Sequence, residues 1–355
     1  VLGYTVEGFK EKDNGVEVLL KDNPSLQADM VVLAIGVTPD TALAKEAGLE
    51  LGIKGSIVVN DRMETSVPDI YAAGDAVQVK HYVTGDDALI SLAGPANKQG
   101  RIIADNICGG DSRYLGSQGS SVIKVFDITA ATTGINETNA KKSGLEVDTV
   151  ILSPMSHAGY YPGGKVMTMK VVFEKETYRL LGAQIIGYEG VDKRIDVLAT
   201  AIHAGLKATQ LKDLDLAYAP PYSSAKDPVN MAGFMIDNIA KGTLKQWHLE
   251  DMDKISKDKS VVLLDVRTVG EFNRGHMDGF KNIPVDELRE RINEIEKGKP
   301  VYLICQSGLR SYIASRILEG NGYETYNFSG GFRFYDVVVN DRVLIERSYV
   351  CGMDY

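Results

Sequence analysis

Pro300-Val301-Tyr302-Leu303-Ile304-Cys305-Gln306-Ser307-Gly308-Leu309-Arg310 joins an apolar stretch, a cysteine and a glycine-bearing turn without interruption. The apolar run at 300–304 predicts a buried strand. A helix is expected next, from Ser311 to Leu318. Because a strand, a tight loop and a helix in this order are typical of an α/β unit, the stretch predicts an α/β domain in which Cys305 stands where a strand gives way to a helix.

The loop after Cys305 has the composition of an anion cradle. Gly308 permits a tight turn, so successive backbone N–H groups can surround the sulfur. The N-terminus of the following helix adds positive potential, and Arg310 adds a full positive charge. These groups are expected to favour the thiolate of Cys305, which is the nucleophilic form. The alternative is a buried structural cysteine at a strand end.

The spacing between Cys305 and Arg310 separates two classes of cysteine chemistry. Cysteine phosphatases place one more residue between the cysteine and the arginine, which makes room for a phosphate. Here four residues intervene. The expected cradle is therefore tighter and suits a single bound sulfur.

Three further motifs accompany this loop, and together with it they resemble a rhodanese domain. They are Leu264-Asp265-Val266-Arg267 with Glu271-Phe272, then Gly275-His276-Met277, and finally Ser329-Gly330-Gly331-Phe332. The resemblance implies that Cys305 accepts a sulfane sulfur as a persulfide, with Arg310 and the loop amides stabilising the anion. The implied persulfide loop is Gln306, Ser307, Gly308 and Leu309, and the implied framework groups are Asp265, Arg267, Glu271 and His276.

The rhodanese-like domain is expected at residues 260–347, after a polar linker at 241–259. Its expected elements are a strand from Val261 to Val266, a charged helix ending near Glu296, the strand and helix around Cys305, and a strand from Tyr323 to Phe328. The tail at 348–355 contains Cys351, which has no supporting loop and is expected to be an exposed thiol.

Length, charge and cysteine usage limit the function classes. A chain of 355 residues is too long for one ordinary core, so roughly two or three domains are expected. The net charge of -9 argues against a nucleic-acid partner. No apolar run approaches the roughly 18 residues of a membrane span. The three cysteines form no CxxC pair, which excludes a thiolate-rich zinc site and suits the reducing cytoplasm.

Thr65-Ser66-Val67-Pro68-Asp69-Ile70-Tyr71-Ala72-Ala73-Gly74-Asp75 predicts a strand from Ile70 to Ala73 that delivers a small-residue turn. Gly74 allows close backbone approach, and Asp75 can accept a hydrogen bond. The stretch resembles the second FAD fingerprint of pyridine nucleotide-disulfide oxidoreductases. That resemblance implies that Asp75 binds a ribityl hydroxyl of the flavin, whereas a bare Gly-Asp after a strand would be an ordinary turn.

A helix is expected from about Ala96 to Ile107, beginning at Pro95 and stopping at Gly109-Gly110. The run Leu92 to Arg101 fits the same family, in which the N-terminus of this helix lies against the flavin pyrimidine edge. The resemblance makes Pro95, Ala96 and Asn97 cofactor-binding residues, and the helix dipole would stabilise negative charge on the reduced ring. A well-capped amphipathic helix without a ligand is the alternative.

The first fifty residues are expected to hold the end of an NAD(P)-binding domain, and residues 51–117 part of an FAD-binding domain. The apolar run Met30 to Ile35 predicts a strand buried on both faces. With the following turn, Leu33 to Asp40 resembles the segment that closes the NAD(P)-binding domain in this family.

Residues 118–240 predict an α+β unit, because strands at Val122–Phe126, Val166–Phe173 and Leu180–Ile186 precede helices at Gly190–Ala204 and Pro228–Ala240. The unit resembles the family's dimerisation domain, and two loops resemble its coenzyme A-disulfide reductase branch. These loops are Ser156 to Gly163 and Tyr218 to Asn230. The resemblance implies that Tyr160 and Tyr218 reach the partner's redox cysteine and act on a departing CoA thiolate.

Other tyrosine roles stay open. Tyr161 and Tyr222 are the near alternatives to the chosen pair, and a rim tyrosine capping a core is the alternative to a catalytic one. His157 is expected to be structural or a phosphate contact.

Two expected features of the family are absent from the sequence. No Gly-x-Gly-x-x-Gly occurs, and no cysteine stands in the family's redox position. Cys108 is no substitute, because it lies near the C-terminal end of a helix, where the dipole opposes a thiolate. We therefore expect an upstream portion of the flavoprotein, carrying both features, before Val1.

The expected fold class is α/β multidomain: the C-terminal part of a flavoprotein with two dinucleotide-binding domains, an α+β dimerisation domain and an α/β rhodanese domain. The expected activity is FAD- and NAD(P)H-dependent reduction of CoA disulfide, CoA persulfide or polysulfide by a cytoplasmic homodimer, with coenzyme A as a further cofactor. The alternative is a flavoenzyme of the NADH oxidase or peroxidase type with a non-catalytic rhodanese docking or sensing domain.

Overall fold

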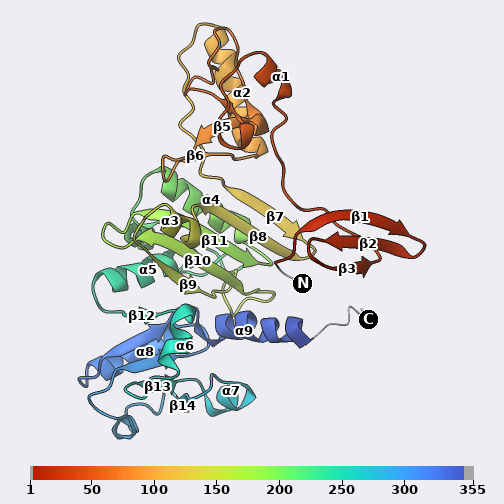
Figure 1. The fold of residues 1–355 in the computed structure, drawn as a ribbon. Coiled ribbons are helices and arrows are strands. Elements are labelled where there is room, and N and C mark those ends of the chain that lie inside the picture. Colours follow the sequence, from red (N-terminus) through yellow and green to blue (C-terminus); the bar gives the residue numbers. More distant parts are fainter. Residues whose placement is uncertain (1–2, 348–355) are drawn as a thin grey trace.

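The computed structural model describes residues 3–347 and arranges them as successive layers with a small sheet to one side (Figure 1). A small unit with α1 and α2 lies at one end, a five-stranded antiparallel sheet lies in the middle, and a parallel α/β domain lies at the other end. Cys351, expected as an exposed thiol, is outside the described residues. None of the described helices is long and apolar enough to cross a membrane.

The N-terminal sheet is a three-stranded antiparallel meander. It consists of β1 (Val6–Lys12), β2 (Gly15–Leu20) and β3 (Asn23–Ala28). The next segment, Met30 to Ile35, is not the predicted buried strand. It runs without a strand partner among the described residues, and Ile35 is 90% exposed. The prediction is wrong because an apolar run becomes a strand only when neighbouring strands take its backbone N–H and C=O groups.

The unit that follows is built around a short sheet of order β4-β5-β6. Its core is Met63, Val77 and Val79, against which Ile102 and Ile103 pack. The predicted strand from Ile70 to Ala73 is reduced to one bridge between Tyr71 and Glu64. The elements are α1 (Ala42–Glu46), β4 (Ile57–Val58), β5 (Val77–Lys80), β6 (Asp87–Ala88) and α2 (Ala93–Ile107).

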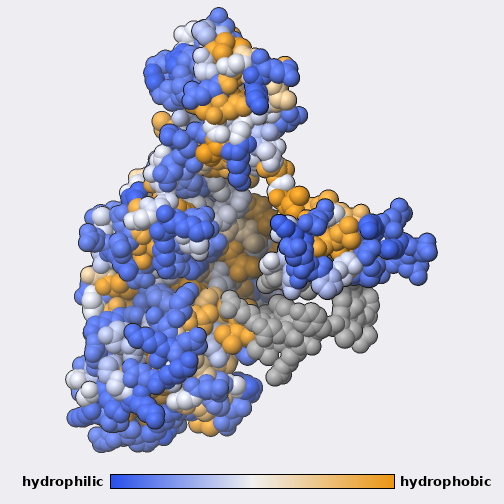
Figure 2. Space-filling view, in the orientation of Figure 1, coloured by the Kyte–Doolittle hydropathy of each residue, from blue (hydrophilic) through white to orange (hydrophobic). Residues whose placement is uncertain are grey.

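The middle sheet has the order β7-β8-β11-β10-β9, and every neighbouring pair is antiparallel. The helices α4 and α5 pack on it, α4 against β8 and β11 and α5 against β9. Val122, Ile123 and Phe126, in β7 and its turn, carry exposed apolar side chains. Hydrophobic residues gather on the side of the middle sheet that faces the N-terminal sheet (Figure 2). The elements are β7 (Ser121–Val125), β8 (Ile128–Gly134), α3 (Glu137–Lys142), β9 (Val147–Leu152), β10 (Met167–Glu174), β11 (Leu180–Gly187), α4 (Val191–His203) and α5 (Pro228–Ala240).

The C-terminal domain is a parallel sheet of order β12-β16-β15-β13-β14. Apolar side chains form two core clusters, one containing Leu303 and Leu318 and the other containing Trp247 and Phe328. The elements are β12 (Gln246–Trp247), α6 (Met252–Ile255), β13 (Val262–Asp265), α7 (Val269–Arg274), β14 (Lys281–Asn282), β15 (Val301–Ile304), α8 (Leu309–Glu319), β16 (Thr325–Phe328) and α9 (Gly331–Arg347).

Two expectations for this region need correction. The predicted linker at 241–259 is wrong from Gln246 on, because β12 pairs with β16 and Trp247 is buried in the domain core. The charged helix expected to end near Glu296 is replaced by the short α7, β14, turns and a 3₁₀ turn at Ile292–Glu294. Gly275 ends α7, and the chain then returns to the sheet. The helix α9 was not predicted from the sequence.

Candidate functional site

The sulfur of Cys305 lies at the carboxyl end of β15 and is surrounded by hydrogen-bond donors. The residue is only 1% exposed. The backbone N–H of Gly308 points at Sγ from 3.1 Å. The Ser311 hydroxyl lies 3.2 Å from Sγ and 3.1 Å from the Gly308 carbonyl oxygen, and with one proton it donates to one of them at a time. Because Gly308 has a φ of 97°, glycine suits this turn.

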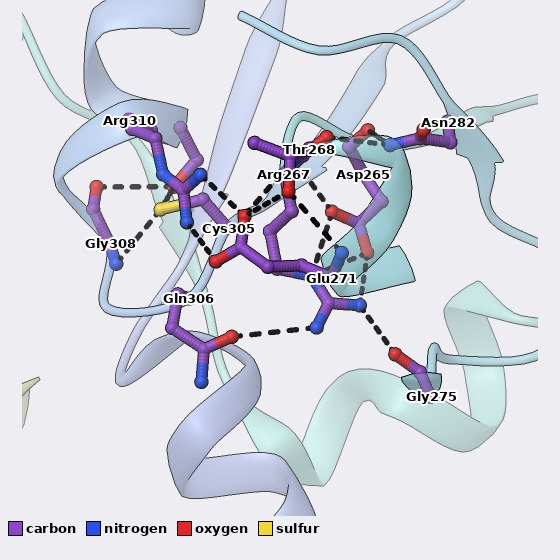
Figure 3. A network of polar contacts seen from close by, with 11 residues as sticks. Asp265, Arg267, Thr268, Glu271, Gly275, Asn282, Cys305, Gln306, Gly308 and Arg310 are labelled. Atoms are coloured by element: carbon purple, nitrogen blue, oxygen red, sulfur yellow. Dashed lines mark hydrogen bonds and ion pairs between the residues drawn. The ribbon is translucent and has the colours of Figure 1, made fainter. Parts of the chain in front are cut away.

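Arg310 stands in the first turn of α8 and pairs with Glu271 of α7 (Figure 3). Its two terminal nitrogens donate to the two carboxylate oxygens, each at 2.7 Å. The Arg310 guanidinium lowers the pKa of Glu271 to about 2, and hydrogen bonds from Thr268 act in the same direction. The ion pair fixes the guanidinium beside the sulfur loop, so Arg310 is held by a partner instead of standing as an isolated charge.

A second ion pair lies beneath the loop and is buried. Arg267, 1% exposed, donates to Asp265 through Nε at 2.9 Å and through Nη2 at 2.6 Å. The same Nη2 donates to the Gly275 carbonyl oxygen at 2.8 Å, and the guanidinium lies 3.8 Å from the centre of the Phe332 ring. These contacts connect β13, the end of α7 and the start of α9, so they hold the base of the site in a fixed arrangement.

The turn after β16 closes against the sulfur loop. The Phe332 N–H donates to the Cys305 carbonyl oxygen at 2.8 Å. A Cβ on Gly331 would lie 2.7 Å from the Gln306 carbonyl oxygen and from the Ser307 nitrogen, so only glycine permits this approach. The predicted Ser329-Gly330-Gly331 motif thus packs directly on the persulfide loop.

The structure brings most of the predicted loop residues together, with three differences. Gln306, Ser307 and Gly308 form the turn, but Leu309 is the first residue of α8 and is exposed. His276 stacks on Phe272 and makes none of the described polar contacts of the loop. Ser311 was missed, although a hydroxyl in the first turn of the helix after a loop cysteine is a signal that could have found it.

The predicted tyrosine pair is a pair in space. The hydroxyl oxygens of Tyr160 and Tyr218 lie 2.5 Å apart, although the residues are far apart in sequence. The hydrogen bond that Tyr218 shares with Tyr160 raises the pKa of Tyr218. Both side chains are open to solvent, with Tyr160 76% and Tyr218 44% exposed. The alternatives Tyr161 and Tyr222 have no such hydroxyl contact among the described residues.

A cavity of about 620 Å³ adjoins this pair, lined by Tyr218, Tyr222, His157 and Lys193 among others. His157 is buried, and its Nδ1 lies 3.1 Å from the Ala158 carbonyl oxygen. The prediction that His157 is structural or a phosphate contact stays a prediction.

The loop that carries Tyr218 and Tyr222 is anchored from below by Asp227, the N-cap of α5. Arg194 is buried and donates to Asp227 at 2.9 Å and to the Ser156 carbonyl oxygen at 2.9 Å. Burial acts to raise the pKa of Asp227, but hydrogen bonds from Ser223, the Val229 N–H and Arg194 outweigh it and lower the pKa. The Arg194–Asp227 pair therefore fixes both tyrosine-bearing loops, since Ser156 precedes Tyr160.

The residues predicted to bind a flavin also lie together. Gly74, with a φ of 83°, donates its N–H to Gln99 of α2 at 2.7 Å, and its hypothetical Cβ would lie 3.9 Å from Ala96. Asp75 is exposed beside this contact. The first turn of α2 has no side-chain cap and no acidic residue, so its N–H groups are available to an electron-rich ligand.

Pro95 and Ala96 are half-buried at this helix start, whereas the Asn97 amide turns back to the Ala93 carbonyl oxygen at 2.9 Å. The exposed carboxylate, the close-approach glycine and the uncapped helix end fit a flavin. Cys108 is exposed just after the other end of α2.

Comparisons with protein families give three successive matches. The family described as pyridine nucleotide-disulphide oxidoreductase matches residues 1–100, its dimerisation domain matches residues 120–228, and the rhodanese-like domain matches residues 248–335. The chain belongs to the pyridine nucleotide-disulphide oxidoreductases. It carries their dimerisation domain and a rhodanese-like domain, and the family uses FAD and NAD(P)H.

Several known proteins are similar to this chain over most of its length or over a large part of it. The crystal structure of reduced Bacillus anthracis CoADR-RHD is 46% identical with a TM-score of 0.90, and the match covers 96% of this chain and 60% of that one. The NAD-dependent persulfide reductase from A. fulgidus is 40% identical with a TM-score of 0.85, over 94% and 60% of the two chains. The NAD(P)H sulfur oxidoreductase (CoA-dependent) of Pyrococcus abyssi is 38% identical over 62% of this chain. The chain spans about half the length of that relative, namely 49%.

Proposed function

We propose that the protein containing this chain is an FAD- and NAD(P)H-dependent reductase of CoA disulfide, CoA persulfide or polysulfide, in which Cys305 carries sulfane sulfur. The observation that carries the proposal is the Cys305 sulfur, buried with the Gly308 N–H and the Ser311 hydroxyl directed at it. Donors within hydrogen-bond distance of the sulfur favour the thiolate over the thiol, and a cysteine that only fills a core does not need this. The similarity to proteins named as sulfur and persulfide reductases supports the same class.

The chemistry at Cys305 follows from this geometry. The thiolate attacks the terminal sulfur of a persulfide R–S–SH, a new S–S bond forms at Cys305, the S–S bond of the donor breaks, and R–S⁻ leaves. The new Cys305 persulfide passes its proton to the departing R–S⁻, which leaves as the thiol R–SH, and the Gly308 N–H and the Ser311 hydroxyl then hold the charge of the persulfide anion. In the reverse direction the incoming CoA thiol gives its proton to the persulfide, the CoA thiolate attacks the terminal sulfur, the S–S bond at Cys305 breaks, and CoA persulfide leaves with the Cys305 thiolate restored.

The tyrosine pair is proposed to act on the thiol that leaves during reduction. The hydroxyls of Tyr160 and Tyr218 share one hydrogen bond, so one of them retains a proton that can be passed to a CoA thiolate. A flavin bound beside Gly74, Asp75 and the start of α2 would supply reducing equivalents. We propose a cytoplasmic homodimer, in which the dimerisation domain presents the pair to the partner.

The Cys305→Ser variant of the complete protein tests the proposal against its Cys108→Ser control. After polysulfide treatment, mass spectrometry is expected to find added sulfur on Cys305 in the wild type and the control, and none at residue 305 in the variant. Polysulfide-dependent NAD(P)H consumption is expected to fall at least about tenfold in Cys305→Ser. If Cys305→Ser consumed NAD(P)H as fast as the wild type, and wild-type Cys305 carried no added sulfur, the rhodanese-like domain would instead be a docking or sensing domain.

A flavoenzyme of the NADH oxidase or peroxidase type is the second candidate function. The hydroxyl contact between Tyr160 and Tyr218 speaks for a thiol substrate, because oxygen reduction does not call for a paired acid of this kind. Rates with CoA disulfide and with oxygen, measured on the same preparation, decide between them. A higher rate with oxygen would support the oxidase.

A further inference from the structure

One edge of the middle sheet, formed by β9, is covered by side chains of the rhodanese-like domain. β9 is one of the two edge strands of this sheet, so one row of its backbone groups has no strand partner among the described residues. The Ile151 N–H donates to the Ser329 hydroxyl oxygen at 3.1 Å, in a buried contact. Two residues away, the Thr149 carbonyl oxygen accepts from the Gln246 side-chain amide at 2.7 Å. Together the two side chains bind the edge as a neighbouring strand would.

A further polar contact adjoins these two bonds. His248 Nε2 lies 3.2 Å from Asp148 Oδ1, and the Gln246 amide nitrogen lies 3.4 Å from the same oxygen. Gln246 belongs to β12 and His248 follows it, so both move with the rhodanese-like domain. The contact surface therefore joins β9 of one domain to β12 and the end of β16 of the other.

Ser329 also stands at the start of the turn that holds Cys305. Its own N–H donates to the Trp247 carbonyl oxygen at 3.0 Å, and three residues later the Phe332 N–H donates to the Cys305 carbonyl oxygen at 2.8 Å. Between them lie two glycines with positive φ, at 100° and 68°. The Arg333 N–H then reaches the Gln306 carbonyl oxygen at 3.2 Å. One short stretch thus contacts both the middle sheet and the sulfur loop.

We propose that Ser329 is a positioning residue that, with Gln246, fixes the Cys305 loop to the dimerisation domain. The inference rests on the proposed function, because it assigns a role in sulfur transfer at that same cysteine. The rhodanese-like domain is then held in one position relative to β9, and Cys305 transfers its sulfur from that position. Loss of the Ser329 hydroxyl frees the turn at its outer end while leaving every contact of Sγ itself in place.

The experiment compares Ser329→Ala, Ser329→Thr and Ser260→Ala in the complete protein. Ser260 is an exposed serine of the same domain whose hydroxyl binds only Asp258 among the described residues, so it is a matched control. Amide hydrogen exchange at Ile151 reports the contact. The saturated rate of sulfur loading on Cys305 by polysulfide, and its unloading to CoA thiol, report the positioning.

Ser329→Ala is expected to speed amide hydrogen exchange at Ile151. It is also expected to lower the saturated rate of sulfur loading roughly fivefold, because one buried hydrogen bond is lost. The polysulfide concentration that gives half the maximal rate should change little. Ser329→Thr is expected to restore both, and Ser260→Ala to match the wild type. Faster exchange with unchanged sulfur transfer would overturn the positioning role, and so would unchanged exchange.

Failure of the proposed function has a different signature. Wild-type Cys305 would take up no sulfur at all, whereas exchange at Ile151 would still respond to Ser329→Ala. The two ideas therefore fail separately. Exchange in β10 and β11, measured in the same samples, shows whether each variant is folded.

Discussion

The Cys305 loop and the Tyr160–Tyr218 pair are held in opposite ways. The loop rests on buried side chains, since Arg267 is 1% exposed and the Asp265 carboxylate beneath it is fully buried. The tyrosine hydroxyls bind each other at a solvent-exposed surface. The loop is preorganised within one chain, whereas the pair gains a low-dielectric environment only when another surface covers it. Substitutions beneath the loop should therefore cost far more stability than substitutions in the pair.

The largest loss of stability is expected from Arg267→Met. The substitution leaves Asp265 buried without its cation, which costs about 3–5 kcal/mol of unfolding free energy. Urea unfolding of the purified protein measures this loss. The matched double variant, Arg267→Met with Asp265→Leu, removes both charges and is expected to recover much of the stability. Equal stability of wild type and Arg267→Met would show that the loop is not supported from below.

A smaller loss of stability is expected from Glu271→Gln, because this carboxylate is less deeply buried than Asp265 and Arg267. Loss of its charged hydrogen bonds to Arg310 is expected to cost about 2 kcal/mol near neutral pH. The Arg310 guanidinium holds the folded-state pKa of Glu271 at about 2, below its usual 4.5. The folded state therefore gains stability from Glu271 above pH 4.5 and loses it as the pH falls toward 2.

Unfolding free energies measured across this window check the sign. The wild type should lose more stability than Glu271→Gln as the pH falls from 4.5 to 2, so the two curves should converge. Parallel curves would mean that the ion pair contributes nothing to stability. Glu290→Gln is a suitable control, because this exposed carboxylate has no ion pair among the described residues.

The contrast also explains which parts of the structure the sequence could predict. The Cys305 loop was predictable because a strand, a spacing and a glycine are all local features. The Tyr160–Tyr218 contact came from a resemblance, since no local pattern joins residues so far apart. β12 escaped prediction because a two-residue strand has no periodicity, and its pairing depends on β16. The apolar run from Met30 to Ile35 predicted a strand, but pairing needs neighbours that a pattern cannot supply.

The smallest effect on stability is expected from Tyr160→Phe. Because the hydroxyl is exposed, its loss should change the unfolding free energy by less than about 0.5 kcal/mol. The same change removes the hydrogen bond that raises the pKa of Tyr218, so that pKa should move back toward 10.0. Ultraviolet titration measures the shift, with Tyr188→Phe, another exposed tyrosine, as the control. A clear loss of CoA disulfide turnover with unchanged stability would mark the pair as functional, whereas a large loss of stability would mean that this surface is as tightly supported as the Cys305 loop.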